Sequence, residues 1–135
     1  MKKIRLILLF LCLAVILPSC TIRESRTDKL KDLEFTVVKE EDIPSELMVM
    51  IEEKKEYPFK VAYADKTYLY IVEGYGMKAT TGYSIQVLES YETQNAIYIR
   101  TNLMGPAKDE KVSETETFPF IVIKMEMNEK NVVFK

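Results

Sequence analysis

Few side chains in this sequence could do chemistry, because it contains two cysteines, Cys12 and Cys20, and no histidine. The usual ligand sets for zinc or copper cannot be built from such a composition. Nucleophilic catalysis by a Ser-His or Cys-His pair is excluded for the same reason. The 21 acidic residues are scattered along the chain, and no pair stands out as a general acid and base. The sequence therefore predicts no catalytic residue, no cofactor and no metal site.

Cys20 is the residue whose surroundings do indicate a reaction. Lys2, Lys3 and Arg5 precede an unbroken apolar run at positions 6–17. A basic start followed by an apolar run of this length is typical of a signal peptide, and a membrane span needs about 20 apolar residues. We therefore expect residues 1–19 to be a signal peptide that is removed on export.

The residues before the cysteine, Leu17-Pro18-Ser19-Cys20, resemble the lipobox of bacterial lipoproteins, although Pro18 stands where a small or hydroxyl residue is more usual. The resemblance implies a diacylglyceryl group on the Cys20 thiol and cleavage just before it. It also implies anchoring at the extracytoplasmic face of the cell membrane. Two or more acyl chains, such as palmitate, hold a protein firmly, whereas one binds only marginally. An uncleaved anchor helix or an ordinary secretory signal are the alternatives.

The part that remains after cleavage has 116 residues, which suits a single domain with its own core. The leader holds three of the 19 basic residues and none of the acidic ones, so the remaining chain has a net charge of −5. An acidic chain argues against nucleic acid as the partner and offers no basic patch to an anionic membrane. Since both cysteines are accounted for, the domain has no disulfide and depends on its core.

The order of predicted elements indicates one tether and one domain. Residues 20–33 are charge-rich and predict a tether, and the domain is expected at 34–135. The convincing helix spans 44–55, with an apolar stripe formed by Ile43, Leu47, Met50 and Ile51. Strands are predicted at 34–38, 59–64, 67–73, 83–88, 96–102, 118–127 and 132–134. A turn-like link at 89–95 and a longer loop at 104–117 separate the later strands.

A strand, a helix and then consecutive strands predict an α+β fold dominated by β structure. Apolar residues occur on both faces of several strands. The antiparallel sheet, of about six to seven strands, is therefore expected to curl into a half-barrel or to form a sandwich-like pair of layers. The amphipathic helix is expected to pack on this sheet.

The most distinctive internal segment is 73–85, which holds three of the four glycines. Glycine permits a positive φ or a close approach of the backbone. The segment is no dinucleotide fingerprint, because a third glycine at the right spacing is missing and a strand follows instead of a helix. The candidate contact residues are Gly74, Tyr75, Gly76, Thr80, Thr81, Gly82 and Tyr83.

This segment resembles the C-terminal domain of the protease-complex subunit PrcB. The resemblance includes the strand 69–72 before the segment and Phe118-Pro119-Phe120 near the end, and it covers roughly residues 66–123. Thr81 stands where that family often has glycine, and Phe118 and Phe120 stand where tyrosines are commoner. The resemblance implies a secreted, often lipid-anchored accessory protein that associates with a protease or envelope partner. It implies no catalytic residue.

A second resemblance involves the same residues. Ala79-Thr80-Thr81-Gly82-Tyr83 is similar to the Asn-Pro-Thr-Thr-Gly-Tyr loop of chagasin-type cysteine-protease inhibitors, which are all-β proteins that insert this loop into the protease cleft. Lys78-Ala79 replaces Asn-Pro here, and the chain has no tryptophan for the family's Arg-Pro-Trp loop. The third interpretation is structural, since glycine-rich turns beside a tyrosine are common hairpin chemistry.

These observations favour a non-enzymatic, membrane-anchored module that binds a protein partner, either a protease or another envelope protein. A chagasin-like inhibitor that uses the loop from Thr80 to Tyr83 is the alternative. Two further possibilities are a carboxylate-based hydrolase of envelope glycans, which needs two acids in one cleft, and a purely structural role. The sequence does not name the partner.

Overall fold

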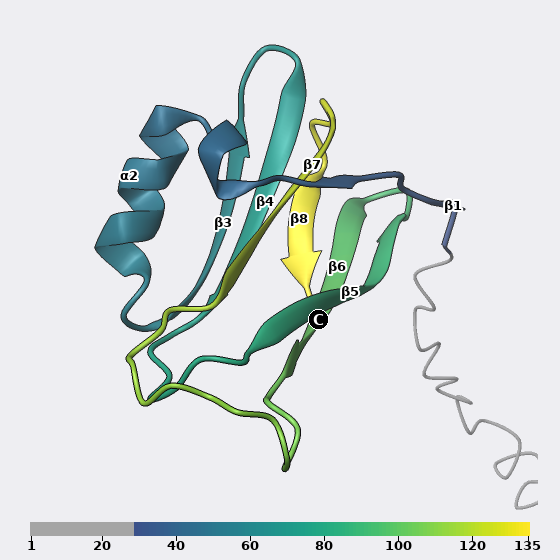
Figure 1. Ribbon diagram of the computed structural model, residues 1–135. Coiled ribbons are helices and arrows are strands. Elements are labelled where there is room, and N and C mark those ends of the chain that lie inside the picture. The colour runs from purple at the N-terminus through teal and green to yellow at the C-terminus, as the bar shows by residue number, and fades with distance from the viewer. Residues whose placement is uncertain (1–28) are drawn as a thin grey trace, which may run out of the picture.

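The computed structural model describes residues 29–135, so the predicted signal peptide, Cys20 and most of the predicted tether lie outside the described residues (Figure 1). The helices and strands are β1 (Lys31–Asp32), β2 (Thr36–Val37), the 3-10 helix η2 (Glu40–Asp42), α2 (Ser45–Lys54), β3 (Pro58–Ala64), β4 (Tyr68–Tyr75), β5 (Ser84–Glu92), β6 (Ala96–Met104), β7 (Phe120–Glu126) and β8 (Asn131–Phe134). The prediction of a β-dominated α+β fold is confirmed. No helix within residues 29–135 is long and apolar enough to cross a membrane.

The strands form two four-stranded sheets, so the sandwich-like alternative is the one present. The first sheet has the order β1-β5-β6-β8, and the second has the order β2-β7-β4-β3. All pairs are antiparallel except β6 and β8, which run parallel. The prediction of an antiparallel sheet is therefore wrong at this pair. Because the chain crosses to the other sheet after β7, β8 is not the second strand of a hairpin and its direction is not fixed by one.

Helix α2 covers the outer face of the second sheet (Figure 1). Pro44 precedes its first residue, where the missing amide hydrogen costs no helical bond. Leu47 and Ile51 are fully buried and pack, with Ile43, against the second sheet. The predicted helix and apolar stripe are thus confirmed, although Met50 is only half-buried.

A second apolar cluster fills the space between the two sheets. Its buried members are Leu69 and Ile71 of β4, Ile97 and Ile99 of β6, and Ile121, Ile123 and Met125 of β7. In β4 the odd-numbered residues face this cluster and the even-numbered Tyr70 and Val72 face α2. This double burial explains why β4 is apolar on both faces, and it holds the two sheets together.

Strand β5 contains a bulge that changes which side chains face the core. Its register with β6 shifts between Val87 and Glu89, so Leu88 is the extra residue. Before the bulge, Ile85 and Val87 pack on the core between the sheets. After it, the inward positions fall on Ser90 and Glu92, which are buried, and Tyr91 on the opposite face is buried too. One extra residue reverses the alternation of the side chains but does not end the strand. Strand β5 continues through the bulge to Glu92, so the predicted link at 89–95 is wrong.

The turn after β5 is short and held by Thr93. The Thr93 amide donates to the carbonyl of Ala96 over 2.9 Å, and the Ala96 amide donates to Thr93 Oγ1 over 3.2 Å. Strand β1 pairs its two residues with Glu92 and Tyr91 of β5. Residues 31 and 32, which the sequence places in the tether, therefore belong to the first sheet.

Candidate functional site

The candidate contact residues begin inside β4 with Gly74, which lies between Phe59 of β3 and Phe120 of β7 in the strand register. A Cβ atom at this position would lie 2.1 Å from ring carbon Cε1 of Phe59. Gly74 is buried, and the absence of a side chain lets the Phe59 ring lie against the strand. Its role in the described structure is close packing.

Tyr75 connects the two sheets through its hydroxyl group. The hydroxyl lies 2.5 Å from Thr101 Oγ1 on β6, and Thr101 donates to Glu73 Oε2 over 2.6 Å. Because the hydrogen of Thr101 is used toward Glu73, Tyr75 is the donor to Thr101. Lys60 Nζ lies 3.9 Å from the other carboxylate oxygen of Glu73. This network joins β4 to β6 with every side-chain group in it partnered.

Gly76 and Gly82 are in conformations that favour glycine. Their φ angles are +75° and +96°, in the left-handed region. A Cβ atom on Gly82 would also lie 2.8 Å from Cβ of Pro106. Both glycines therefore shape the connection between β4 and β5.

Thr80 and Thr81 hold this connection against the loop 105–119. Thr117 Oγ1 donates to the carbonyl of Thr80 over 2.7 Å, and the amide of Ser113 donates to Thr81 Oγ1 over 2.9 Å. The amide of Thr81 donates in turn to the carbonyl of Ser113 over 3.1 Å. The two loops lie together at one end of the sandwich (Figure 1). Tyr83 is half-buried there and lies beside Gly105.

Strand β4, the glycine-containing connection, β5, β6, the loop 105–119 and β7 follow one another along the chain. Residues 69–126 match the family model described as PrcB C-terminal. The family prediction from the sequence is thereby confirmed over this range. The PrcB C-terminal match contains all seven candidate contact residues, and it omits α2, β3 and β8. No curated protein and no solved structure matches the chain.

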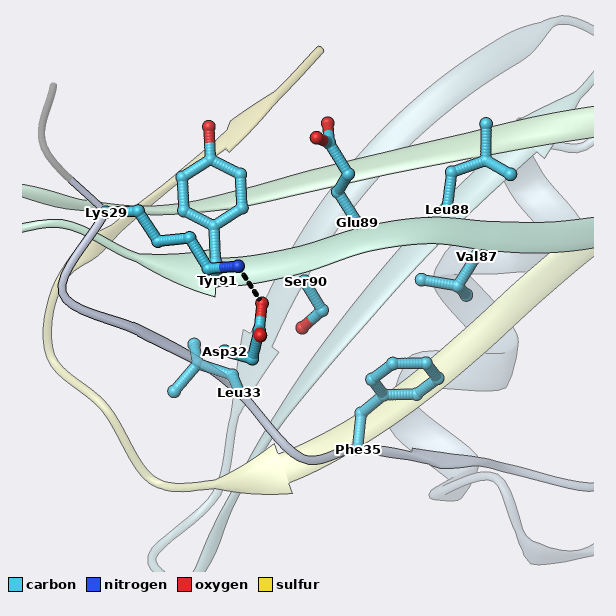
Figure 2. A pocket seen from close by; sticks show the side chains of 9 residues that line it. All are labelled: Lys29, Asp32, Leu33, Phe35, Val87, Leu88, Glu89, Ser90 and Tyr91. Carbon is cyan, nitrogen blue, oxygen red and sulfur yellow. Dashed lines mark ion pairs between the residues drawn. The ribbon is translucent and has the colours of Figure 1, made fainter. Parts of the chain in front are cut away.

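A hollow of about 480 Å³ lies away from the candidate contact residues, between β5 of the first sheet and the segment that leads from β1 to β2. Figure 2 shows Phe35, Val87 and Ser90 pointing into the same space, and Leu33 also lines the hollow. Leu88, Glu89 and Tyr91 lie on the other side of β5 (Figure 2). At one end of the hollow, Lys29 Nζ and Asp32 Oδ1 form an ion pair of 2.5 Å.

Ser90 is a buried polar residue beside this hollow. The residue is 7% exposed, and its buried Oγ has no hydrogen-bond partner among residues 29–135. The sequence reasoning missed the hollow, because it ended the strand at residue 88 and treated Ser90 as part of a link. The sequence carries no local signal of the bulge, because the buried residues at even positions after Leu88, Ser90 and Glu92, are both polar.

The charged groups around the first sheet are paired, and their pKa values reflect it. Hydrogen bonds from Lys130 Nζ and Asn128 Nδ2, at 3.0 and 3.1 Å, lower the pKa of Glu92. The hydrogen bond from Arg100 Nε, at 2.8 Å, lowers the pKa of Glu89. Such pairs fix strand ends and offer no free general base. In the part of the chain from 29 to 135, no three His, Cys, Asp or Glu residues cluster as metal ligands would.

Proposed function

We propose that this chain is a non-enzymatic lipoprotein, anchored through lipid on Cys20, that binds a protein partner in an extracytoplasmic protease complex or another envelope complex. The observation that carries this proposal is the match of residues 69–126 to the PrcB C-terminal family, which agrees with a protease-associated module. The sequence adds the lipobox-like Leu17-Pro18-Ser19-Cys20.

The spacing of the chain is consistent with such an anchor. Ten residues separate Cys20 from Lys31, the first residue of β1. A chain of that length reaches at most roughly 35 Å. The domain would therefore stay close to the membrane surface, where it can meet other anchored proteins.

The surface of the domain also supports binding rather than catalysis. The outer face of the first sheet has no covering helix among residues 29–135 and carries exposed Leu88, Met104 and Val133. On the same face the buried Tyr91 stacks on the half-buried Tyr98, with ring centroids 5.2 Å apart. Exposed apolar side chains such as Leu88, Met104 and Val133 are a kind of surface that protein interfaces use.

The anchoring is tested by comparing the two cysteines. We expect the native chain to fractionate with membranes and to take up labelled palmitate. Cys20→Ala should be soluble and unlabelled, whereas Cys12→Ala should behave as the native chain, since that residue leaves with the leader. Membrane association of Cys20→Ala would show that the leader itself is the anchor and would contradict the lipoprotein part of the proposal.

Partner binding is tested separately, by chemical crosslinking in intact envelopes followed by purification of the tagged native chain. We expect a defined protein, recovered reproducibly, with crosslinks to the domain. Recovery of no protein partner would contradict the proposal even if the anchor is correct.

We do not propose the chagasin-like inhibitor, because no observation favours it. Such an inhibitor would insert the loop from Thr80 to Tyr83 into a protease cleft. Here Thr81 Oγ1 and the backbone of Thr80 are hydrogen-bonded to the loop 105–119 instead. A papain-like protease assay gives the direct answer, and we expect no inhibition at micromolar concentrations of the chain.

A further inference from the structure

We propose that residues 84–89 of β5 take up an extended peptide of the partner as an added strand, with one of its side chains in the adjacent hollow. This inference rests on the proposed function as a protein-binding module, and it names the surface and the chemistry of the partner. Strand addition to an open sheet edge provides main-chain hydrogen bonds for affinity and a side-chain pocket for specificity.

Strand β5 has an unpaired edge at residues 84–89. Along its whole length β5 pairs with β6 on one side. On the other side β1 pairs only with Tyr91 and Glu92, and the amide of Leu33 adds one bond to the carbonyl of Ser90. Residues 84–89 therefore have no strand neighbour on that side within 29–135. Their outward amides and carbonyls are free to bind another strand.

This edge of β5 also lacks the residues that usually block strand addition. The open edge strand β3 begins with Pro58 and carries Lys60, two features that discourage pairing. The other edge of the first sheet, β8, has only four residues. Residues 84–89 contain no proline and no lysine, and their single charge, Glu89, is held by Arg100.

The hollow lies directly beside this edge of β5. Strand β1 shows that a chain can pair antiparallel with this edge, but it leaves the edge at Leu33 to reach the second sheet. A peptide that continues the line of β1 would direct alternate side chains between Leu33, Phe35 and Val87. A methyl group suits these apolar walls, and threonine and valine are the residues with high strand propensity that present one.

The experiment uses the full-length lipoprotein in detergent micelles and a blocked hexapeptide of alternating threonine and valine. Amide hydrogen exchange is measured with and without peptide. We expect exchange within 84–89 to slow by roughly tenfold when free peptide is about ten times its Kd. The same peptide N-methylated at alternate residues should give no slowing, because it keeps the side chains and loses the donors.

Two matched variants locate the site. Phe35 is 37% exposed and lines the hollow, whereas Val133 is 38% exposed on β8. Phe35→Lys should abolish the slowing, and Val133→Lys should leave it unchanged. No slowing at 84–89 with the native chain would overturn the proposal, as would slowing at 58–64 or 131–134 instead. Slowing that rises with protein concentration without peptide would assign the edge to a second copy of the chain and also overturn it.

The native partner separates this inference from the proposed function. If Phe35→Lys still recovers the crosslinked partner at the native yield, the partner binds elsewhere; the edge proposal then fails and the proposed function stands. If the native chain recovers no partner, the proposed function fails. Loss of the partner in Phe35→Lys but not in Val133→Lys supports both.

Discussion

Two hydroxyl groups on neighbouring strands of the first sheet have opposite surroundings. Thr101 on β6 accepts a hydrogen bond from Tyr75 and donates one to Glu73. Ser90 on β5 is more deeply buried, and its Oγ has no partner among the described residues. The glycine-containing connection beyond Tyr75 is likewise bonded to the loop 105–119, whereas the β5 edge beside Ser90 is open on one side.

The difference shows that a conspicuous motif is not necessarily the part of a domain that has unpaired hydrogen-bonding groups available for a partner. Groups that are already paired gain little from a partner, because a new bond only replaces an old one. Unpaired buried groups and unpaired strand edges gain most from one. The following predictions test whether the Gly74–Tyr83 region is structural and the β5 edge is not.

The largest effect is expected from Gly74→Ala. The added Cβ would lie 2.1 Å from Phe59 Cε1, so the ring or the strand must move. We expect a loss of about 3 kcal/mol in the free energy of unfolding, as for severe overpacking of a core. Urea denaturation monitored by circular dichroism measures it.

Gly105→Ala is the matched control for this substitution. A Cβ atom there would meet only Tyr83 Cε1, at 3.5 Å, and Gly105 is not among the described glycines with positive φ. Its stability should be unchanged or higher by up to about 1 kcal/mol. Equal stability of Gly74→Ala and Gly105→Ala would show that Phe59 moves freely and that Gly74 is not held by packing.

The second effect is expected from Thr101→Val, which keeps the shape of the side chain and removes the hydroxyl. Glu73 loses a donor and Tyr75 loses an acceptor, so we expect a loss of about 2 kcal/mol in unfolding free energy. Thr101→Ser keeps the hydroxyl and should retain most of that stability. If Thr101→Val is as stable as the native chain, the network does not hold the sheets together.

The sequence was sufficient for those parts of the fold that depend on regular periodicity. The stripe of Ile43, Leu47 and Ile51 predicts α2 to within a residue at each end. The double burial of β4 appears in the sequence as an apolar run and leads to the two-layer alternative. The PrcB C-terminal family was also recognised over nearly the range that matches.

The parts that the sequence did not predict depend on contacts between distant residues. The bulge at Leu88 reverses the alternation of β5, and only its pairing with β6 reveals this. The parallel direction of β8 follows from a crossover between sheets, which no local pattern encodes. The hydrogen bonds of Thr80 and Thr81 could not be predicted, because their partners Thr117 and Ser113 are 37 and 32 residues away.

The third effect concerns acidic pH and the other end of β5. Hydrogen bonds from Lys130 and Asn128 hold the pKa of Glu92 below its ordinary value of 4.5. Because the folded pKa is the lower one, Glu92 stabilises the fold fully above pH 4.5 and loses this contribution as the pH falls through the folded value. Urea midpoints of the native chain and Glu92→Gln should therefore differ at pH 7 and converge at lower pH.

Glu129→Gln is the control for this pH dependence, since Glu129 is exposed and belongs to the same turn as Lys130. It should leave the midpoint at pH 7 close to the native value. A difference between Glu92→Gln and the native chain that is constant across the pH range would show that packing, not the charge of Glu92, is responsible. In that case the hydrogen bonds to the Glu92 carboxylate would not stabilise the fold, and Glu92 would not contrast with the unpartnered Ser90.

The smallest effect, and the one of opposite sign, is expected from Ser90→Ala. The substitution removes a buried hydroxyl that has no partner within residues 29–135, so unfolding free energy should rise by up to about 1 kcal/mol. Ser84→Ala, which removes an exposed hydroxyl from the same strand, should change stability by less than about 0.5 kcal/mol. A loss in Ser90→Ala comparable with that of Thr101→Val would mean that the hydroxyl is satisfied. The surroundings of Ser90 and Thr101 would then no longer differ.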